Sequence, residues 1–159
     1  MKSLDQTDMK ILALLQEEGR ITNAELAQRI GMSAPPCLRR VRALEREGYI
    51  TGYHADLDAA KLGWGVTVFA MVGLHSQAEA DLQAFEDRVA TWPEVRECHM
   101  LNGEIDFILK CVAPDLASFQ KFLTRYLTPA PNVAHVRTSL TIRQSKQVFG
   151  VPLSAEDAD

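Results

Sequence analysis

The sequence has few of the residues that mark disulfide-rich or metal-binding proteins. Its 159 residues include only three cysteines, Cys37, Cys98 and Cys111, which are odd in number and lack C-x-x-C spacing. Because each lies among apolar residues, we interpret all three as thiols in or near a core, in a reducing compartment. The four histidines are scattered without ligand spacing. Neither a metal site nor a cofactor is therefore predicted.

Long hydrophobic runs are also missing. No run approaches the roughly 18 apolar residues that a membrane helix needs, and the chain does not open with the basic and then apolar regions of a signal peptide. We therefore predict a cytoplasmic protein without a membrane partner. At 159 residues, the chain can hold one ordinary domain or two small ones.

An overall excess of positive charge is missing as well, since the net charge is −4. The charge is unevenly distributed, however: residues 1–53 carry eight Lys and Arg against seven Asp and Glu, and the remainder carries nine against fourteen. Between Arg29 and Arg46 there are five arginines and one glutamate. Because charges act over a Debye length of roughly 8–10 Å, the acidic remainder does not cancel this basic segment.

The basic segment predicts one helix with two different faces. Ser33 is a preferred N-cap, Pro35 and Pro36 fall in the first turn, where a missing N–H does no harm, and Gly48 favours a stop. At about 100° per residue, apolar residues gather on one side and arginines on the other. The apolar side holds Cys37, Val41 and Leu44, flanked by Leu38, and the basic side holds Arg39, Arg42 and Arg46, flanked by Arg40.

Taken alone, such a helix is equally well a solvated surface helix, but its neighbours favour DNA. Thr22 and Glu25 form a capping box that opens a short helix to Ile30, and Gly31-Met32 links it to the basic helix. An amphipathic helix over about 4–15 comes first, with Asp8 as its one polar intruder. With a strand predicted over 49–53, these elements form a winged helix-turn-helix, whose second motif helix enters the major groove.

The predicted partner is therefore double-stranded DNA. An arginine fork can grip a phosphate or a guanine edge, which a lysine cannot do in the same way. We expect Arg39 and Arg42 to meet base edges or nearby phosphates, and Arg40 and Arg46 to contact mainly the backbone. The full set of candidate DNA-binding residues is Ser33, Pro35, Pro36, Arg39, Arg40, Arg42 and Arg46.

From residue 54 the pattern changes from helical to mixed. Residues 54–65 are predicted to be a linker, 66–147 a second domain and 148–159 a loose tail. Within the second domain, strands are expected at 66–74, 95–101, 105–112 and 133–143, and helices at 78–91 and 116–127, with Asn102-Gly103 as a hairpin signal. This order is the ferredoxin-like βαββαβ unit, so the predicted fold class is α+β.

Both faces of the predicted sheet are apolar. In the strand over 66–74, the even-numbered residues are mostly Val and Leu, whereas Phe69 and Met71 point the other way. Two helices cover only one face of a four-stranded sheet, so the second face needs a partner, and a homodimer is the simplest one. The alternative is a solvated face with incidental hydrophobic residues.

The chain resembles the Lrp/AsnC, or feast/famine, family of transcription regulators, and especially its leucine-responsive group. The matching residues are 4–12, 19–27, 33–41, 44–53, 97–99 and 102–107, and the resemblance extends to about residue 147. It implies a sequence-specific DNA-binding regulator with a winged helix-turn-helix domain and an ACT-like (RAM) domain. It also implies a free amino acid as effector, bound between dimers, and homodimers that assemble further, often to octamers.

The resemblance places the effector site at Asn102, Gly103, Glu104, Ile105 and Asp106. Gly103 lets backbone approach a small ligand, and Asp106 can pair with an α-ammonium group. The alternative is that Asp106 is a hairpin residue that bonds its neighbours. This chain departs from the family at Ile105, where an aromatic residue is common, and at Asn132, where glycine is frequent.

Two other functions fit part of this pattern. Some proteins of this architecture are sirohaem decarboxylases with a His-Asn-Tyr-x-Arg type cluster, but residues 96–100 lack its Tyr and Arg. An interaction module that assembles without binding DNA would not explain the sorted arginine face. We therefore predict a DNA-binding regulator and no enzyme.

Overall fold

The computed structural model of the protein describes residues 4–153. These residues divide into two compact units, which are described separately. One unit holds the chain up to Asp56 together with the segment from Lys146 onward, and the other is Leu57–Ser145. Across residues 4–153, no helix is both long enough and apolar enough to cross a membrane.

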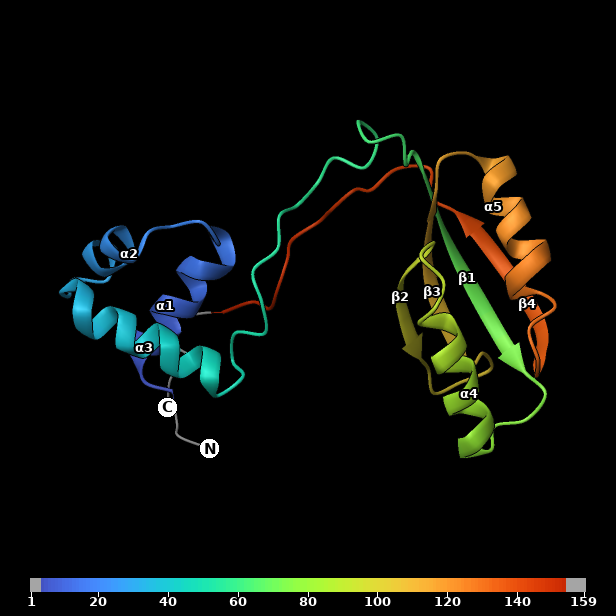
Figure 1. Ribbon diagram of the computed structural model, residues 1–159, viewed down its shortest axis with the longest axis horizontal. Coiled ribbons are helices and arrows are strands. Elements are labelled where there is room, and N and C mark those ends of the chain that lie inside the picture. The colour runs from blue at the N-terminus through green and yellow to red at the C-terminus, as the bar shows by residue number, and fades with distance from the viewer. Residues whose placement is uncertain (1–3, 154–159) are drawn as a thin grey trace. The chain divides into compact units, whose positions relative to one another are not determined.

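The first unit is a bundle of three helices (Figure 1). They are α1 (Gln6–Glu17), α2 (Asn23–Arg29) and α3 (Ala34–Arg46). Asp5 and Asp8 form a capping box at the start of α1, and the predicted box of Thr22 and Glu25 caps α2. The buried core of the unit consists of Ile11, Leu26, Ala27, Cys37 and Leu44. The predicted helix-turn-helix is therefore confirmed.

The predicted strand over residues 49–53 is wrong. These residues form no strand, and the backbone N–H groups of Tyr49 and Ile50 both donate to the Leu44 carbonyl. Gly48 adopts a left-handed φ of 80°, which ends α3 and turns the chain back on it. A strand needs a partner for its backbone groups, and here the end of α3 takes that place.

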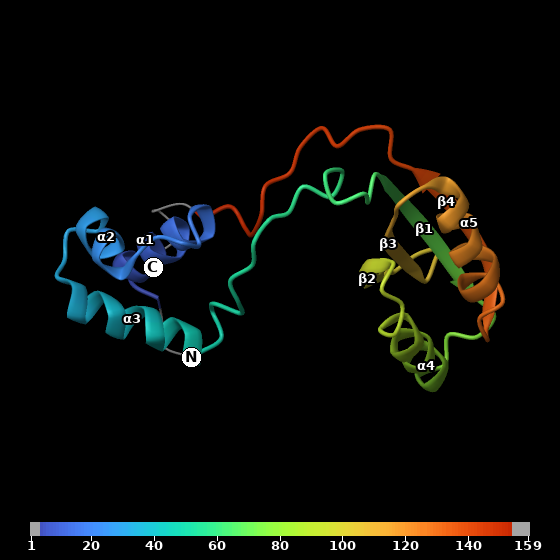
Figure 2. The ribbon, with the colours of Figure 1, turned by 45° about the horizontal axis from the view of Figure 1, so that its top comes forward.

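The second unit is a four-stranded antiparallel sheet covered by helices (Figures 1 and 2). Its strands lie in the order β2-β3-β1-β4, which confirms the ferredoxin-like topology. In chain order the elements are β1 (Val66–Leu74), α4 (Glu79–Val89), β2 (Val95–Met100), β3 (Phe107–Ala113), α5 (Leu116–Phe122), a short π-helical turn η1 (Leu123–Leu127) and β4 (Val133–Leu140). The predicted helix over 116–127 thus ends in a π-helical turn.

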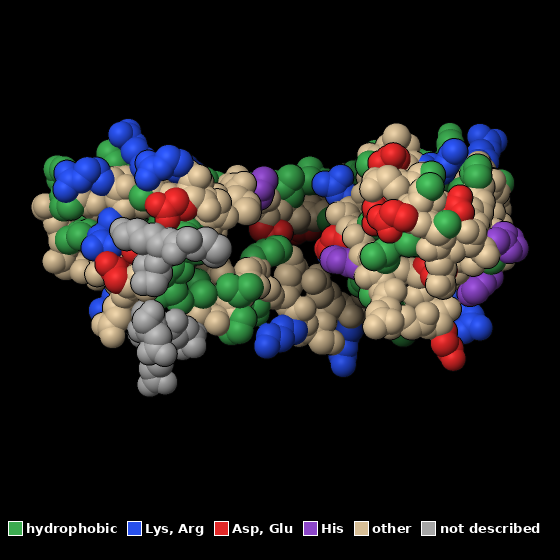
Figure 3. All heavy atoms as spheres, turned by 90° about the horizontal axis from the view of Figure 1, so that it is seen from below, with side chains coloured by type: hydrophobic (Ala, Val, Ile, Leu, Met, Phe, Trp, Pro, Cys, Tyr) green, Lys and Arg blue, Asp and Glu red, His purple; other side chains and the backbone are tan. Residues whose placement is uncertain are grey.

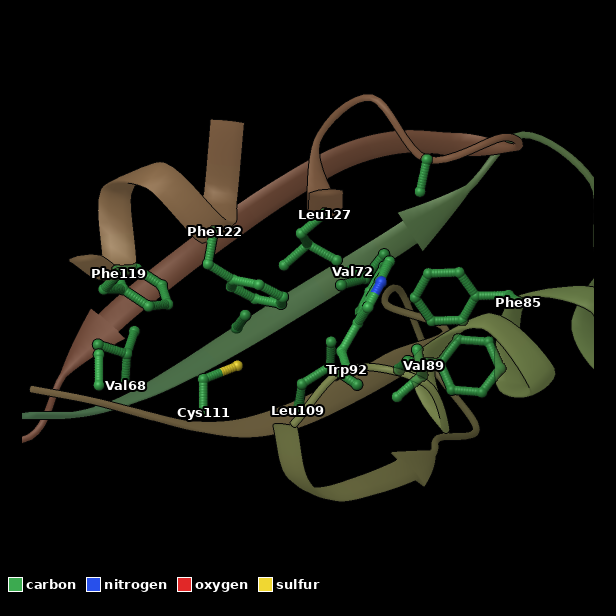
Figure 4. Close-up of a cluster of buried hydrophobic side chains, with 14 of the residues drawn as sticks. Val68, Val72, Phe85, Val89, Trp92, Leu109, Cys111, Phe119, Phe122 and Leu127 are labelled. Carbon is green, nitrogen blue, oxygen red and sulfur yellow. The ribbon is translucent and has the colours of Figure 1, made fainter. Parts of the chain in front are cut away.

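The two faces of the sheet differ as the alternation predicts. Side chains of β1 and β3 on one face pack with those of α4 and α5 into a core (Figure 4). In the close-up, Val68, Val72, Leu109 and Cys111 rise from the strands to meet Phe85, Val89, Trp92, Phe119, Phe122 and Leu127. Phe69, on the other face, is exposed. Both helices therefore cover one face only.

The cysteines behave as the sequence predicts. All three are free thiols; Cys37 and Cys111 are buried, and Cys98 is partly buried. Burial raises the pKa of the Cys111 thiol to about 12 and that of Cys98 to about 11. Thiols with a raised pKa are weak nucleophiles at neutral pH, so these residues serve the cores.

The segment that follows the sheet differs from the predicted loose tail. As far as Leu153 it groups with the three-helix unit, because the side-chain amide of Gln16 bonds the backbone of Val151. The remaining tail residues, 154–159, lie outside the described part of the chain. The sequence could not reveal this contact, since the two partners lie 135 residues apart.

Candidate DNA-binding surface and effector loop

The outward face of α3 carries exposed arginines. Arg39, Arg42 and Arg46 are exposed, whereas Cys37 and Leu44 on the opposite side are buried. Among the described residues, no ion pair is formed by Arg39 or Arg42, and Arg46 contacts only the neighbouring Glu47 at 3.8 Å. Lys and Arg side chains are exposed on the surface of the three-helix unit in Figure 3. Guanidinium groups in this state can approach a polyanion without first breaking internal bonds.

The first turn of α3 is also open to an anion. Ser33 is the exposed N-cap, yet within the described part of the chain its side chain makes no capping hydrogen bond. Pro35 is exposed and Pro36 is partly buried. A free hydroxyl next to the N-terminus of a 13-residue helix is suited to a phosphate oxygen.

Arg40 is engaged within the protein. Its Nη1 atom lies 2.7 Å from Oδ2 of Asp5 and 2.7 Å from Oδ1 of Asp8. The bond to Asp8 and then that to Asp5 raise the pKa of Arg40. Asp8, the polar residue in the apolar stripe of α1, is 5% exposed. The predicted backbone-contacting arginine thus holds α3 against the start of α1.

Asn23 has a role that the sequence does not predict. Its Nδ2 atom donates to the carbonyl of Ala34 at 3.0 Å, which ties α2 to the first turn of α3. Its buried Oδ1 atom has no hydrogen-bond partner among the described residues. Asn23 lies directly after the Thr22 cap, where polar residues are common at the start of a helix. The neighbouring sequence therefore does not indicate a contact with α3.

The predicted effector loop joins β2 to β3. Asn102, Gly103 and Glu104 are exposed, Ile105 is partly buried, and the Leu101 N–H donates to the Asp106 carbonyl at 2.8 Å. The connection is therefore longer than the two-residue hairpin that Asn-Gly predicts. A side chain added at Gly103 would meet open space, so no described residue crowds the loop at this position.

Asp106 is buried at the base of this loop. Its Oδ2 accepts from the Leu74 N–H at 2.6 Å, and its Oδ1 accepts from Nε2 of Gln77 at 2.7 Å. Its side chain thus ties the loop to the end of β1. These contacts agree with the alternative interpretation of Asp106, as a residue that bonds its neighbours. Each carboxylate oxygen that accepts one hydrogen bond still retains a further lone pair.

Asn132 completes a polar cluster at the same end of β1. Its φ of 67° is left-handed, a conformation that asparagine tolerates better than most residues, which explains the departure from glycine. Its side chain donates to the Ser76 carbonyl at 2.8 Å and accepts from the Ser76 N–H at 2.9 Å. Ser76 and Gln77 are consecutive, so residues near 76, 106 and 132 meet at one end of the sheet.

The region compared with a decarboxylase cluster is an ordinary strand edge. Glu97 pairs with Nζ of Lys110 at 2.7 Å, and that bond is the main reason why the pKa of Glu97 is lowered. His99 lies 3.4 Å from the same carboxylate. Within residues 4–153, no cluster of three or more His, Cys, Asp or Glu side chains is suited to a metal ion.

Comparison with known proteins agrees with both units. The family model for the Lrp/AsnC ligand binding domain matches residues 67–151, and a model for winged helix-turn-helix DNA-binding matches residues 4–51. The chain is 57% identical over 150 residues to a leucine-responsive regulatory protein of Rhizobium meliloti, covering 94% of this chain and 96% of that protein. It is 42% identical over 143 residues to a Bkd operon transcriptional regulator of Pseudomonas aeruginosa, covering 90% and 94%.

A solved structure shows the same arrangement of elements. A transcriptional regulator from Neisseria meningitidis, in complex with L-Met, superposes with a TM-score of 0.90 at 36% identity, covering 95% of this chain and 97% of that one. The relatives are regulators, which favours the regulator over the enzyme that the sequence left as an alternative.

Proposed function

Because this chain belongs to the Lrp/AsnC family of transcriptional regulators, we propose that α3 binds double-stranded DNA and that a free amino acid controls this binding. The observation that carries the proposal is the row of exposed arginines on α3, opposite the residues that the helix buries. Such a regulator acts on chromosomal DNA in the cytoplasm.

On DNA, α3 lies in the major groove and its arginines take two roles. Arg39 and Arg42 reach base edges or nearby phosphates, and Arg46 and Ser33 contact the phosphate backbone, with Pro35 and Pro36 shaping the first turn. Arg40 contributes by fixing the angle of α3 through Asp5 and Asp8. The assignment rests on which guanidinium groups are free and which are engaged.

The effector is a free amino acid held beside the loop Asn102–Asp106, between dimers. The Neisseria meningitidis relative binds L-Met, and the loop here is exposed and leaves open space at Gly103. Asp106 fixes the loop to β1 and has lone pairs left for an ammonium group. The partly buried Ile105 is placed to contact an apolar ligand side chain.

Homodimers form through the uncovered face of the sheet and assemble further, to an octamer. The apolar residues on that face include Phe69, Met71 and Ile108, and the register pairs Met71 with Ile108 on adjacent strands. In a symmetric dimer the same apolar face of each chain is buried against that of the other. Two DNA-binding units then meet half-sites about one helical turn, roughly 34 Å, or a multiple apart.

A thermal-shift screen over the twenty amino acids tests the effector proposal. An amino acid present at 100 times its dissociation constant stabilises the folded state by about 2.7 kcal/mol, so at least one amino acid is expected to raise the melting temperature clearly. Its effect on the affinity for the DNA upstream of the protein's own coding sequence is then followed by fluorescence anisotropy. If no amino acid raises the melting temperature at millimolar concentration, the effector proposal fails.

A further inference from the structure

The segment that follows β4 returns to the three-helix unit and binds α1 there. Nε2 of Gln16 donates to the carbonyl of Val151 at 2.8 Å, and the Val151 N–H donates to Oε1 of Gln16 at 2.9 Å. One side-chain amide thus satisfies both backbone groups of one residue, much as a neighbouring strand would. Both ribbon views draw this red segment entering the unit that holds α1, α2 and α3 (Figures 1 and 2).

Gly150 is fitted to this contact in two ways. Its φ is +80°, in the left-handed region where side chains are strained, and a Cβ atom at this position would overlap the side chain of Gln16. A side chain at position 150 would therefore strain the backbone and displace the Gln16 amide that bonds Val151. The contact depends on the sequence of the segment and on the sequence of α1 together.

The docked segment also lines an open cavity of about 790 Å³ within the same unit. Its lining includes Leu15 and Gln16 of α1, Tyr53 and His54, and Phe149 of the segment. Tyr53 in turn donates its hydroxyl to Glu45 of α3 at 3.0 Å. The segment thus bonds α1, and a residue that lines the same cavity bonds α3.

We propose that the C-terminal half of α1, with residues 52–56, is the docking surface for the chain's own segment 146–153. The docked segment then acts as a second connection between the three-helix unit (the DNA-binding unit) and the unit Leu57–Ser145 (the ligand-binding unit). The chain leaves the DNA-binding unit after Asp56 and rejoins it at Lys146, so both ends of the ligand-binding unit are attached to it. A displacement at the end of β4 then acts on α1, in addition to any displacement carried by the linker that precedes β1. This coupling rests on the proposed function, whereas the docking does not.

Hydrogen–deuterium exchange on the full chain tests the docking without DNA or effector. Gln16→Ala removes both hydrogen bonds, and Gly150→Val blocks the docked position, so each is expected to speed the exchange of amides in 146–153 about tenfold. Gln120→Ala removes an exposed amide side chain from α5 and serves as the control, with exchange unchanged. Far-UV circular dichroism verifies that each variant is folded. Segment exchange in the parent at the rate of an unprotected peptide overturns the proposal.

Dilution separates docking within one chain from docking onto a second copy. Protection that persists when the protein is diluted until it is monomeric supports the docking that we propose. Protection that disappears with the oligomer shows that the segment binds α1 of another chain, and it overturns docking within one chain.

The coupling is tested by DNA affinity in the presence of the amino acid found by the screen. In Gln16→Ala the basal DNA affinity and the thermal shift should match the parent, while the change in DNA affinity caused by the amino acid falls by half or more. An unaltered response in that variant overturns the coupling. A parent that does not respond at all removes both the coupling and the effector proposal, and the exchange experiment still decides the docking.

Discussion

At the scale of single residues, the arginines of α3 fall into two groups. Arg39 and Arg42 are exposed, whereas Arg40 is held by two carboxylates from α1. The sequence predicted that the arginines lie opposite the buried side of the helix, because helical spacing alone decides on which side a residue lies. It could not separate Arg40 from its neighbours, because its partners lie 35 and 32 residues away along the chain.

Replacement of Arg40 by alanine should therefore act on stability. Asp8 is 5% exposed and would lose its charged partner, which for a buried group of this kind costs roughly 1–3 kcal/mol. Arg46→Ala, on the same helix with a side chain that is 72% exposed, is the matched control and should leave the free energy of unfolding unchanged. Urea denaturation of both variants provides the comparison. Equal stability of Arg40→Ala and the parent would mean that the pair with Asp8 contributes nothing.

Asp106 is the second residue whose role differs from the simplest prediction. Asp106→Ala leaves the Leu74 N–H without its acceptor and frees Gln77, so a loss of about 1–3 kcal/mol in folding free energy is expected. The same variant should lose the thermal shift caused by the effector, since the loop is no longer fixed. Glu104→Ala, which changes the exposed part of the loop, should keep the parent's stability. A variant that is as stable as the parent would contradict the structural role of Asp106.

At the scale of elements, periodicity predicted the helices and strands well where one side is buried. The alternation in β1 correctly placed Val68 and Val72 in the core and Phe69 outside it. The predicted strand at 49–53 failed because its aromatic and β-branched residues satisfied the propensity rule, while its backbone found acceptors at the end of α3. Propensity describes the residues of a strand, but pairing decides whether the strand exists.

The uncovered face of the sheet makes a direct prediction about assembly. Met71→Asp places a charge among apolar residues of that face, so it should dissociate the dimer, because an unpaired charge is costly to bury. Leu116→Asp makes the same change at an exposed position on α5, where the side chain is 56% exposed, and should leave the dimer intact. Multi-angle light scattering at micromolar concentration measures both masses. A dimer of unchanged mass for Met71→Asp would place the interface on another surface.

At the scale of the whole molecule, two units with separate cores present different surfaces. The three-helix unit presents the basic face of α3, and the other unit presents the loop for which we propose an effector and the uncovered sheet face. Both units could be predicted from the sequence, because the core of each is built from local periodic patterns. The return of residues 146–153 to the first unit could not, since one glutamine and one glycine carry it and neither belongs to a pattern.

The most direct test of the central claim is the DNA affinity of the Arg39→Ala, Arg42→Ala double variant. The DNA is the region upstream of the protein's own coding sequence, and fluorescence anisotropy is measured at fixed salt. Loss of contacts to bases or nearby phosphates should cost about 2 kcal/mol or more, close to a thirtyfold weaker affinity. Arg88→Ala, Arg125→Ala removes the same charge from exposed positions of the ligand-binding unit and should bind nearly as tightly as the parent. If the Arg39, Arg42 variant also binds like the parent, α3 does not lie in the groove and the account is contradicted.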